Sequence, residues 1–290
     1  MSANQDRQTV LITGGTDGLG KAATLLLAER GYQVFATGRS AEKRAQLAAL
    51  ARDKNLPIET VEMDVCDDRS VQDALASIFQ QAGKLDVLIN NAGLVYPGAV
   101  EDLRLEDWRR QFETNLFGVL RVTQGVLPHM RERRKGRILM MSSVSGFITA
   151  PTQGAYSASK FAIEAVSNAL RNELYPFGIH TILIQPGYIM TNIQKTAMDL
   201  AQSYQDKIQN GPYARLYAAY LGNAGSTRAA SKTTPEDCAR IMLRAIEAPR
   251  PKARYGVTSL AHYVRLMKWI FTDGAADAIL RRRYGITLAR

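Results

Sequence analysis

A tyrosine and a lysine stand four positions apart in the run YSASK, at Tyr156 and Lys160. On a helix, side chains at this spacing share one face. A phenol with a pKa of about 10 exchanges protons poorly near neutral pH, but a neighbouring ammonium favours the phenolate and lowers that pKa. The pair therefore predicts proton transfer through Tyr156. The same spacing also arises by chance on exposed helix faces, so its place in the fold decides its meaning.

The sequence before this pair predicts that it lies at the edge of a sheet. The apolar run RILMM at 137–141 is predicted to be a strand, and Ser142 and Ser143 follow it directly. Ser143 precedes Tyr156 by thirteen residues. Doubly wound sheets bind their ligands at the carboxyl ends of the strands, so the hydroxyl groups and the Tyr–Lys pair are expected to meet there.

A glycine-rich loop follows the first predicted strand and precedes a helix. It reads Thr13-Gly14-Gly15-Thr16-Asp17-Gly18-Leu19-Gly20, with the spacing G-x-x-x-G-x-G. Glycines allow the backbone to approach a pyrophosphate, and the helix N-terminus offers free N–H groups and the positive end of its dipole. The spacing differs from the common G-x-G-x-x-G fingerprint. A plain turn is the alternative, but the position between strand and helix favours a dinucleotide site.

The end of the second predicted strand indicates which dinucleotide is bound. Folds that bind NAD place an acidic residue here to hold the ribose 2′-hydroxyl. This chain instead has Gly38 and Arg39, followed by Ser40. Gly38 is expected to leave open the space of the missing carboxylate, and the planar guanidinium of Arg39 is suited to a 2′-phosphate. A solvated arginine at the start of a helix is the alternative.

The elements that position these residues alternate along the chain. Strands are predicted at 9–13, 33–37, 58–63, 87–90, 137–141, 180–185 and 254–257. Helices are predicted at 21–30, 41–53, 70–81, 106–130, 157–175 and 235–248. Strand runs this apolar are buried on both faces, and their alternation with helices predicts a parallel sheet between two helical layers. The fold class is therefore α/β, a doubly wound Rossmann-type fold with a seven-stranded parallel sheet.

One domain with a helical C-terminal extension is predicted. Residues 1–257 form the catalytic domain, and an irregular segment at about 192–232, rich in Tyr, Ala and Gln, is its substrate loop. Residues 258–290 form an amphipathic extension of the same domain. In its first part, Leu260, Val264, Met267 and Phe271 fall on one helical face.

Composition restricts the compartment and the partners. The chain has 37 Lys and Arg against 27 Asp and Glu, a formal net charge of +10, which favours anionic partners such as a phosphorylated cofactor. Two cysteines exclude a disulfide scaffold and favour the reducing cytoplasm, and the three scattered histidines argue against a metal site. The polar N-terminus does not resemble a signal peptide. No groove-entering or base-stacking motif accompanies the charge, so no nucleic-acid partner is predicted.

Taken in order, these motifs resemble those of the short-chain dehydrogenase/reductase family. The matching segments are the glycine loop, Asp64-Val65, Asn90-Asn91-Ala92-Gly93, Asn115, Ser143, Tyr156-x-x-x-Lys160, and Pro186-Gly187 with Thr191. The resemblance is strong over residues 8–191 and loose over 235–257. The extension resembles those of members that act on steroids, retinoids or other lipophilic carbonyls.

The resemblance implies a catalytic tetrad of Asn115, Ser143, Tyr156 and Lys160. In the family, the tyrosine exchanges a proton with the substrate oxygen and the serine hydrogen-bonds that oxygen. The lysine holds the nicotinamide ribose and lowers the pKa of the tyrosine, and the asparagine holds a water of the proton relay. The cofactor contacts that it implies, besides Tyr156 and Lys160, are Gly14, Thr16, Asp17, Gly18, Leu19, Gly20, Arg39, Ser40, Asp64, Val65, Asn91, Ala92, Gly93, Pro186, Gly187, Ile189 and Thr191.

The function expected from these residues is NADP(H)-dependent hydride transfer between an alcohol and a ketone or aldehyde. The reaction is expected to run in the direction of reduction, with a lipophilic carbonyl as the substrate. An NAD-linked alcohol dehydrogenase of the same family is the first alternative, and a non-catalytic cofactor-binding regulator is a remoter one. The family also implies a homodimer or homotetramer formed through the helices at 106–130 and 157–175. Contact of the basic extension with an anionic membrane is less favoured than a role in covering the pocket.

Overall fold

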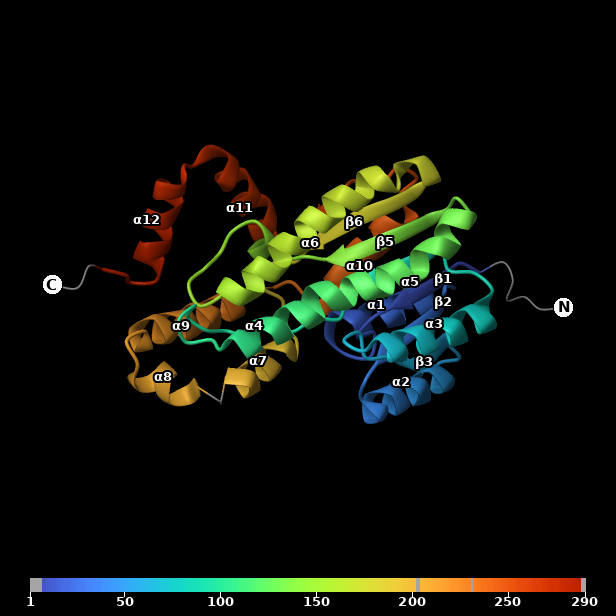
Figure 1. Ribbon diagram of the computed structural model, residues 1–290, viewed down its shortest axis with the longest axis horizontal. Coiled ribbons are helices and arrows are strands. Elements are labelled where there is room, and N and C mark those ends of the chain that lie inside the picture. Colours follow the sequence, from blue (N-terminus) through green and yellow to red (C-terminus); the bar gives the residue numbers. More distant parts are fainter. Residues whose placement is uncertain (1–6, 202–203, 231, 288–290) are drawn as a thin grey trace.

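The β-branched runs form a single parallel sheet in the order β3-β2-β1-β4-β5-β6-β7. The computed structural model describes residues 7–201, 204–230 and 232–287 (Figure 1). The strands are β1 (Thr9–Ile12), β2 (Gln33–Gly38), β3 (Ile58–Glu62), β4 (Val87–Asn90), β5 (Gly136–Met141), β6 (Ile179–Gln185) and β7 (Arg254–Gly256). The order reverses between β1 and β4, which is where such sheets bind ligands. The predicted seven-stranded Rossmann-type fold is confirmed.

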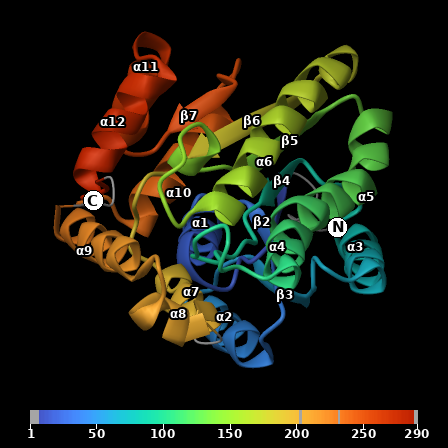
Figure 2. The same ribbon diagram turned by 60° about the vertical axis from the view of Figure 1, so that its left-hand side comes forward.

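Helices cover both faces of the sheet. α1 (Gly18–Glu29), α2 (Ala41–Asp53) and α10 (Pro235–Glu247) pack on one face. α3 (Asp68–Ala82), α5 (Gly118–Glu132) and α6 (Gly154–Glu173) pack on the other (Figure 2). The strands β1, β4, β5 and β6 are largely apolar because they lie between these two helical layers, whereas the edge strands β3 and β7 are only partly buried. The carboxyl ends of the strands are thereby held rigidly and in register.

The predicted helix at 106–130 is interrupted. α4 (Leu105–Phe112) passes into a π-helical turn at Glu113–Phe117 before α5 begins. A π turn inserts one extra residue into the helical ladder and is frequent at functional sites. The interruption aims the side chain of Asn115 inward, where it is buried. A single continuous helix was therefore the wrong prediction at the position where one candidate catalytic residue lies.

The segment predicted to be irregular at 192–232 is largely helical. It forms α7 (Ile193–Ala201), α8 (Gln205–Asn210) and α9 (Ala214–Ala230), which lie beyond the carboxyl ends of the strands (Figure 1). The prediction failed because Ala, Leu and Gln are good helix formers even where no clear apolar stripe marks a helix. These three helices are called the lid below.

The C-terminal extension is helical, as predicted. It forms α11 (Ser259–Ile270) and α12 (Asp273–Arg283) at the same end of the molecule as the lid. Val264 is half-buried and Phe271 is exposed, whereas the side chains of Leu260 and Met267 lie outside the described residues. Among the described residues, no helix is long and apolar enough to cross a membrane.

Candidate active site

The predicted proton-transfer pair lies at the carboxyl end of β5. Tyr156 and Lys160 come from the first turns of α6, and the Lys160 ammonium lies 5.7 Å from the centre of the Tyr156 ring. Ser143 follows β5 and hydrogen-bonds Tyr156. The Lys160 Nζ donates to the carbonyl oxygen of Met141 at 2.7 Å. Serine, tyrosine and lysine thus meet at one strand end.

Asn115 reaches the same place from the π turn. Its Nδ2 donates to Ser159 Oγ at 3.1 Å and to the Leu94 carbonyl at 3.0 Å, and its Oδ1 accepts from the Leu94 N–H at 2.9 Å. Ser159 Oγ in turn donates to the Tyr156 carbonyl at 2.7 Å. Asn115 is therefore linked through Ser159 to the backbone of Tyr156. The sequence did not single out Ser159 or the Leu94 carbonyl as parts of this site.

Burial governs the titration of the pair. It raises the pKa of Tyr156, and the hydrogen bond with Ser143 partly opposes that rise. The expectation that the Lys160 ammonium lowers this pKa below its usual value is therefore not met, because burial outweighs the other effects on the phenol. Burial also lowers the pKa of Lys160 to about 8. In both cases the low-dielectric surroundings disfavour the charged form. The phenol is consequently protonated near neutral pH, and the lysine lies within reach of losing its proton.

A small cavity joins these side chains to the predicted cofactor loops. Its volume is about 70 Å3. Its walls combine the catalytic candidates with apolar groups from the glycine loop and the lid: Leu19, Asn91, Gly93, Leu94, Met141, Ser142, Tyr156, Lys160, Pro186 and Ile193. The cavity brings together motifs that lie more than 150 residues apart in the sequence. Its lining is the switch-point crevice that the fold predicts.

The glycine loop fits a dinucleotide phosphate. Gly14 and Gly18 have φ values of +62° and +50°, which L side chains rarely adopt. A Cβ at Gly20 would collide with the Gly14 carbonyl, so the loop closes tightly on the start of α1. Asp17 caps this helix by accepting from Gly18 N–H at 2.8 Å. Lys43 pairs with the Asp17 carboxylate at 2.5 Å and so offsets its charge beside the anion site.

Two neighbouring loops fix the glycine loop in place. Asn91 Nδ2 donates to the carbonyl oxygens of Thr13 and Gly14 at 3.0 and 3.1 Å. The backbone N–H groups of Asn91 and Ala92 both donate to Thr13 Oγ1. On the other side, Thr191 lies within 3.4 Å of the position that a Cβ at Gly18 would take. The predicted cofactor loops after β1, β4 and β6 therefore line one crevice.

The end of β2 differs in one respect from expectation. The space beside Gly38 is filled, because a Cβ there would lie 2.6 Å from the hydroxyl of Thr16. The expectation that Gly38 leaves an open space for a carboxylate is therefore wrong, because the Thr16 side chain occupies that space. Arg39 is 70% exposed and lies 3.6 Å from Asp64, and Ser40 caps α2. The predicted adenine-side residues Arg39 and Asp64 are brought together, with the guanidinium open to solvent.

The lid is attached to the body through tyrosines. Tyr217 donates to Asp102 and accepts from the Ala99 N–H, both at 2.8 Å, and Tyr204 donates to the Pro97 carbonyl. Gln153, three residues before Tyr156, donates to the hydroxyl of Tyr220 at 2.9 Å. Burial raises the pKa of Tyr220 to about 12, with smaller contributions from the phenols of Tyr284, Tyr156 and Tyr188.

Gln153 is a residue near the site that the sequence did not indicate, whereas its partner Tyr220 lies in the segment predicted to be the substrate loop. The phenol of Tyr220 lies near that of Tyr156 and near Tyr284 from the C-terminal extension. No local motif marks either residue, because the lid and the loop before α6 are brought together only by the fold. The position of Gln153 directly before the tyrosine motif was the one available signal.

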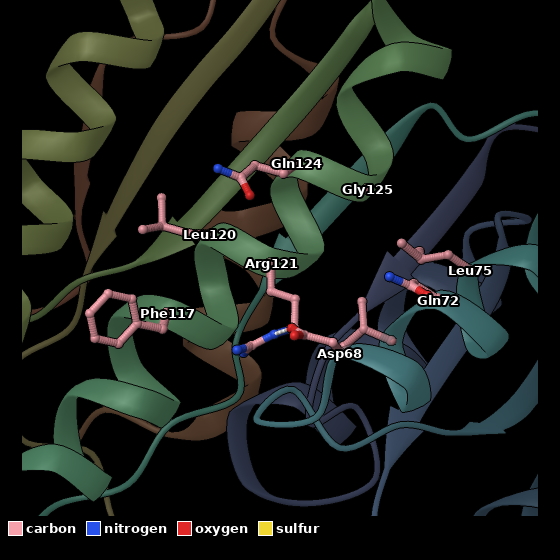
Figure 3. A pocket seen from close by; sticks show the side chains of 9 residues that line it. Asp68, Gln72, Leu75, Phe117, Leu120, Arg121, Gln124 and Gly125 are labelled. Carbon is pink, nitrogen blue, oxygen red and sulfur yellow. Dashed lines mark hydrogen bonds and ion pairs between the residues drawn. The ribbon is translucent and has the colours of Figure 1, made fainter.

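A larger hollow lies away from this site, between α3 and α5 (Figure 3). It has a volume of about 440 Å3 and contains none of the predicted site residues. Arg121 crosses it to pair with Asp68, and Phe117 stands at its rim, 48% exposed. Its lining is formed by Asp68, Val71, Gln72, Leu75, Phe117, Leu120, Arg121, Gln124 and Gly125. This surface is called the α3/α5 groove below.

Residues 8–201 match the family model described as short chain dehydrogenase. An uncharacterized oxidoreductase of Bacillus subtilis, YusZ, is 34% identical over 280 residues, which covers 96% of this chain and 99% of that protein. Human 17-beta-hydroxysteroid dehydrogenase type 1 is 33% identical over 258 residues, covering 87% of this chain and 78% of the human protein.

Solved structures share the whole architecture. A short-chain dehydrogenase from Streptomyces avermitilis superposes with a TM-score of 0.78 at 26% identity, covering 97% of this chain and 98% of that one. An actinorhodin polyketide ketoreductase variant with NADPH superposes with a TM-score of 0.74 at 29% identity, covering 88% of this chain and 97% of that one. A short-chain dehydrogenase/reductase from Burkholderia phymatum in complex with NAD superposes with a TM-score of 0.79 at 23% identity, covering 91% of this chain and 94% of that one. With the family model matched over most of its length, this chain belongs to the short-chain dehydrogenase/reductase family of oxidoreductases.

Proposed function

We propose that this protein transfers a hydride between NADP(H) and an alcohol–carbonyl pair, and that it reduces a lipophilic ketone or aldehyde. The observation that carries the proposal is the convergence of Ser143, Tyr156 and Lys160 on one strand end, beside a loop suited to a dinucleotide. A regulator without catalysis would have no chemical need for that set.

Each catalytic candidate has a distinct task in this proposal. Tyr156 holds the proton that passes to the carbonyl oxygen, and its raised pKa keeps that proton in place near neutral pH. Ser143 hydrogen-bonds the same oxygen and stabilises its developing charge. Lys160 favours loss of the proton through its charge. Asn115, joined to Tyr156 through Ser159, holds the outer end of the relay.

The cofactor would be held by residues that the crevice brings together. A bound nicotinamide supplies the hydride, and the chain positions it. The N-terminus of α1 and the glycine loop hold the phosphates. The Lys160 ammonium has three donors, of which one is used on the Met141 carbonyl, so two remain for the ribose hydroxyls.

The preference for NADP(H) rests on Arg39. Its exposed guanidinium at the end of β2 can pair with a 2′-phosphate, and no carboxylate occupies the first position after the strand. The Asp64 carboxylate, 3.6 Å from Arg39, supports the NAD-linked alternative, because it can compete for the same guanidinium. The relative affinities for the two cofactors decide between them.

A lipophilic substrate is supported by the lid. The cavity walls near Tyr156 carry Leu94 and Ile193, and the described side chains that line the cavity include no carboxylate. The relation to a human steroid dehydrogenase is consistent with such a substrate. Both cysteines are free thiols, which supports action in the cytoplasm.

A second copy of this chain is the proposed partner. The α3/α5 groove presents Phe117 and Leu120 beside α5, and a twofold contact between two copies would cover such a surface symmetrically. We propose that the protein is a homodimer or a homotetramer built on this side of the sheet.

Two variants test the catalytic assignment. Tyr156→Phe removes only the proton donor, so we expect kcat to fall by roughly 10²- to 10⁴-fold with the Kd for NADPH unchanged. Lys160→Ala removes the charge and a ribose contact, so turnover falls and NADPH binds about 10-fold more weakly. Turnover of a ketone panel with NADPH and calorimetric titration measure both. Wild-type turnover in Tyr156→Phe would refute the proposal.

A further inference from the structure

A buried carboxylate lies directly behind the catalytic candidates and has no part in the function proposed so far. Glu164 stands on α6, one turn after Lys160, and its side chain is only 12% exposed. Its Oε1 accepts from Ser142 Oγ at 2.6 Å and from Gln185 Nε2 at 2.8 Å. Its Oε2 accepts from Arg254 Nε at 3.0 Å. The carboxylate therefore joins the ends of β5 and β6 to the start of β7.

Two consecutive residues at the end of β5 are held by α6. The Met141 carbonyl accepts from Lys160, and the Ser142 hydroxyl donates to Glu164. Lys160 and Glu164 have the i, i+4 spacing that places them on one helix face. The next residue along the chain is Ser143, whose hydroxyl bonds Tyr156. Helix α6 thus holds both Met141 and Ser142, the two residues that directly precede Ser143. These two bonds restrict the direction in which Ser143 points.

The turn after Ser143 leaves little space around this attachment. A Cβ at Gly146 would lie 2.6 Å from Ser142 Oγ and 3.2 Å from Glu164 Cγ. The glycine lets the turn at Val144–Gly146 close over the carboxylate. The Ser142 hydroxyl is consequently confined between the turn and Glu164, so it has little freedom to take another partner.

The Glu164 carboxylate is also held from outside. Arg254 donates through Nη2 to Asn168 Oδ1 at 2.7 Å, so its guanidinium is shared between two residues of α6. A charge this deeply buried is tolerated because arginine and two neutral donors satisfy its oxygens. If Glu164 served only to attach β7, its bond with Arg254 would be sufficient. Its bond with Ser142 instead holds the end of β5, where the catalytic candidates lie.

We propose that Glu164 is a positioning residue for the reaction: by holding the Ser142 hydroxyl, it sets the direction of Ser143 relative to Tyr156. This inference rests on the proposed hydride transfer and adds a residue that does not touch the reacting atoms. Displacement of a catalytic group by about 1 Å from a remote change can cost around 100-fold in rate. Loss of the Ser142–Glu164 bond therefore lowers kcat with little effect on binding.

Three variants separate this role from a merely structural one. Ser142→Ala removes the hydrogen bond and leaves the ion pair, and we expect kcat to fall roughly 10-fold while KM for NADPH stays within about threefold. Glu164→Leu removes the acceptor of the Ser142 bond, and kcat falls roughly 10- to 100-fold. Asn168→Ala removes the other anchor of Arg254 and is the matched control, with kcat within about twofold of wild type.

The double variant and a structure complete the test. If both residues act through one bond, Ser142→Ala in the Glu164→Leu background adds no further loss. Rates are expressed per NADPH-binding site, so that a change in folded fraction does not count. In a crystal structure of Ser142→Ala, we expect Ser143 Oγ to be displaced by roughly 0.5 Å or more from its wild-type place.

The outcomes distinguish this inference from the proposed function. Wild-type kcat in Ser142→Ala, a loss confined to KM, or an unmoved Ser143 would each overturn the positioning role while Tyr156→Phe remains inactive. If Tyr156→Phe instead keeps wild-type turnover, the proposed function fails, and the crystal structure still decides whether Glu164 sets the direction of Ser143.

Discussion

At the scale of single residues, the titration of Lys160 limits the pH range of the reaction. Burial lowers its pKa to about 8, so the ammonium is present below that pH and is lost as the pH rises through it. Tyr156, whose pKa burial raises, keeps its proton throughout. With NADPH as the varied substrate, we expect kcat/KM for carbonyl reduction to be level near pH 7 and to fall roughly tenfold per unit above about 8.

Lys160→Arg supplies the control for this pH profile. A guanidinium stays charged over the whole accessible range, so this variant has lower activity but lacks the decline above pH about 8. Stopped-flow measurement of NADPH oxidation across the range records both curves. A wild-type profile that stays level to pH about 10 would contradict the assignment of this titration to Lys160.

At the same scale, the proposed preference for NADP(H) depends on Arg39. A charge-assisted hydrogen bond contributes roughly 1.5–3 kcal/mol, and the exposure of the guanidinium places the effect at the lower end of that range. We expect Arg39→Ala to lower the ratio of kcat/KM for NADPH over NADH by about 10-fold or more, through weaker NADPH binding alone. An unchanged ratio, or a wild-type preference for NADH, would show that Arg39 does not bind the 2′-phosphate.

Gly38→Ala is the steric control for this test. Thr16 fills the space beside Gly38, so an added Cβ displaces the Thr16 hydroxyl in the glycine loop. That displacement should weaken NADPH and NADH alike and leave their ratio within about twofold. A Gly38→Asp exchange would carry the same steric cost in addition to its charge, and therefore does not isolate the electrostatic effect.

The convergence of the catalytic candidates could be predicted because their spacing is local. Tyr156 and Lys160 lie one helical turn apart, and Ser143 follows an apolar strand run. The residues that support them could not be predicted in the same way. Arg254 meets Glu164 across 90 residues, and Tyr220 meets Gln153 across 67. Such pairs depend on which elements the sheet order makes neighbours, and no periodicity in a single sequence encodes that contact.

At the scale of elements, the predictions failed where the helix pattern carries no distinguishing signal. The π turn at Glu113–Phe117 keeps helical periodicity on both sides, so a continuous helix was the natural prediction. α9 carries Ala and Tyr without a clear apolar stripe, and the lid packs on the body through a few separate side chains, including Ala201, Tyr204 and Tyr217. Strands were predicted within one or two residues because runs buried on both faces are short and uniformly apolar.

The C-terminal extension should act as part of the substrate cover. The phenol of Tyr284, just after α12, lies close enough to Tyr220 to contribute to its raised pKa. Deleting the residues after Thr272 removes Tyr284 from the surroundings of Tyr220 and is expected to open the site near Tyr156. We expect KM for bulky ketones to change at least about threefold and KM for small ketones to stay within about twofold, measured over a size series of ketones.

Vesicle binding tests the competing role of this extension. α11 exposes Tyr263, Leu266 and Ile270 beside Arg265, a combination that can also lie on an anionic membrane. If the extension only covers the site, little protein sediments with acidic vesicles at physiological salt, where the Debye length is about 8 Å. Strong sedimentation that salt reverses and the deletion abolishes would favour membrane docking, as would unchanged KM values across the ketone series.

At the scale of the whole molecule, we predict that two copies of the chain associate through the α3/α5 groove, on the face of the sheet opposite α1 and α10. Phe117 is 48% exposed at the rim of the α3/α5 groove, one turn before Arg121 on the same helical run (Figure 3). Twofold assembly on this side would bring two copies of the rim together and bury both rings. Phe117→Arg would then place like charges beside Arg121 and across the axis, where desolvated charges without partners are strongly unfavourable.

We therefore expect Phe117→Arg to convert the proposed dimer or tetramer into a smaller species, as measured by light scattering after gel filtration. Ile279→Arg is the matched control, because Ile279 is also an exposed apolar side chain but lies on α12, away from the groove and from both helices expected to form the interface. It should leave the mass unchanged. The Ser143, Tyr156 and Lys160 site is built within one chain, so both variants should retain NADPH binding. A wild-type monomer, or an unchanged mass in Phe117→Arg, would contradict assembly through this groove.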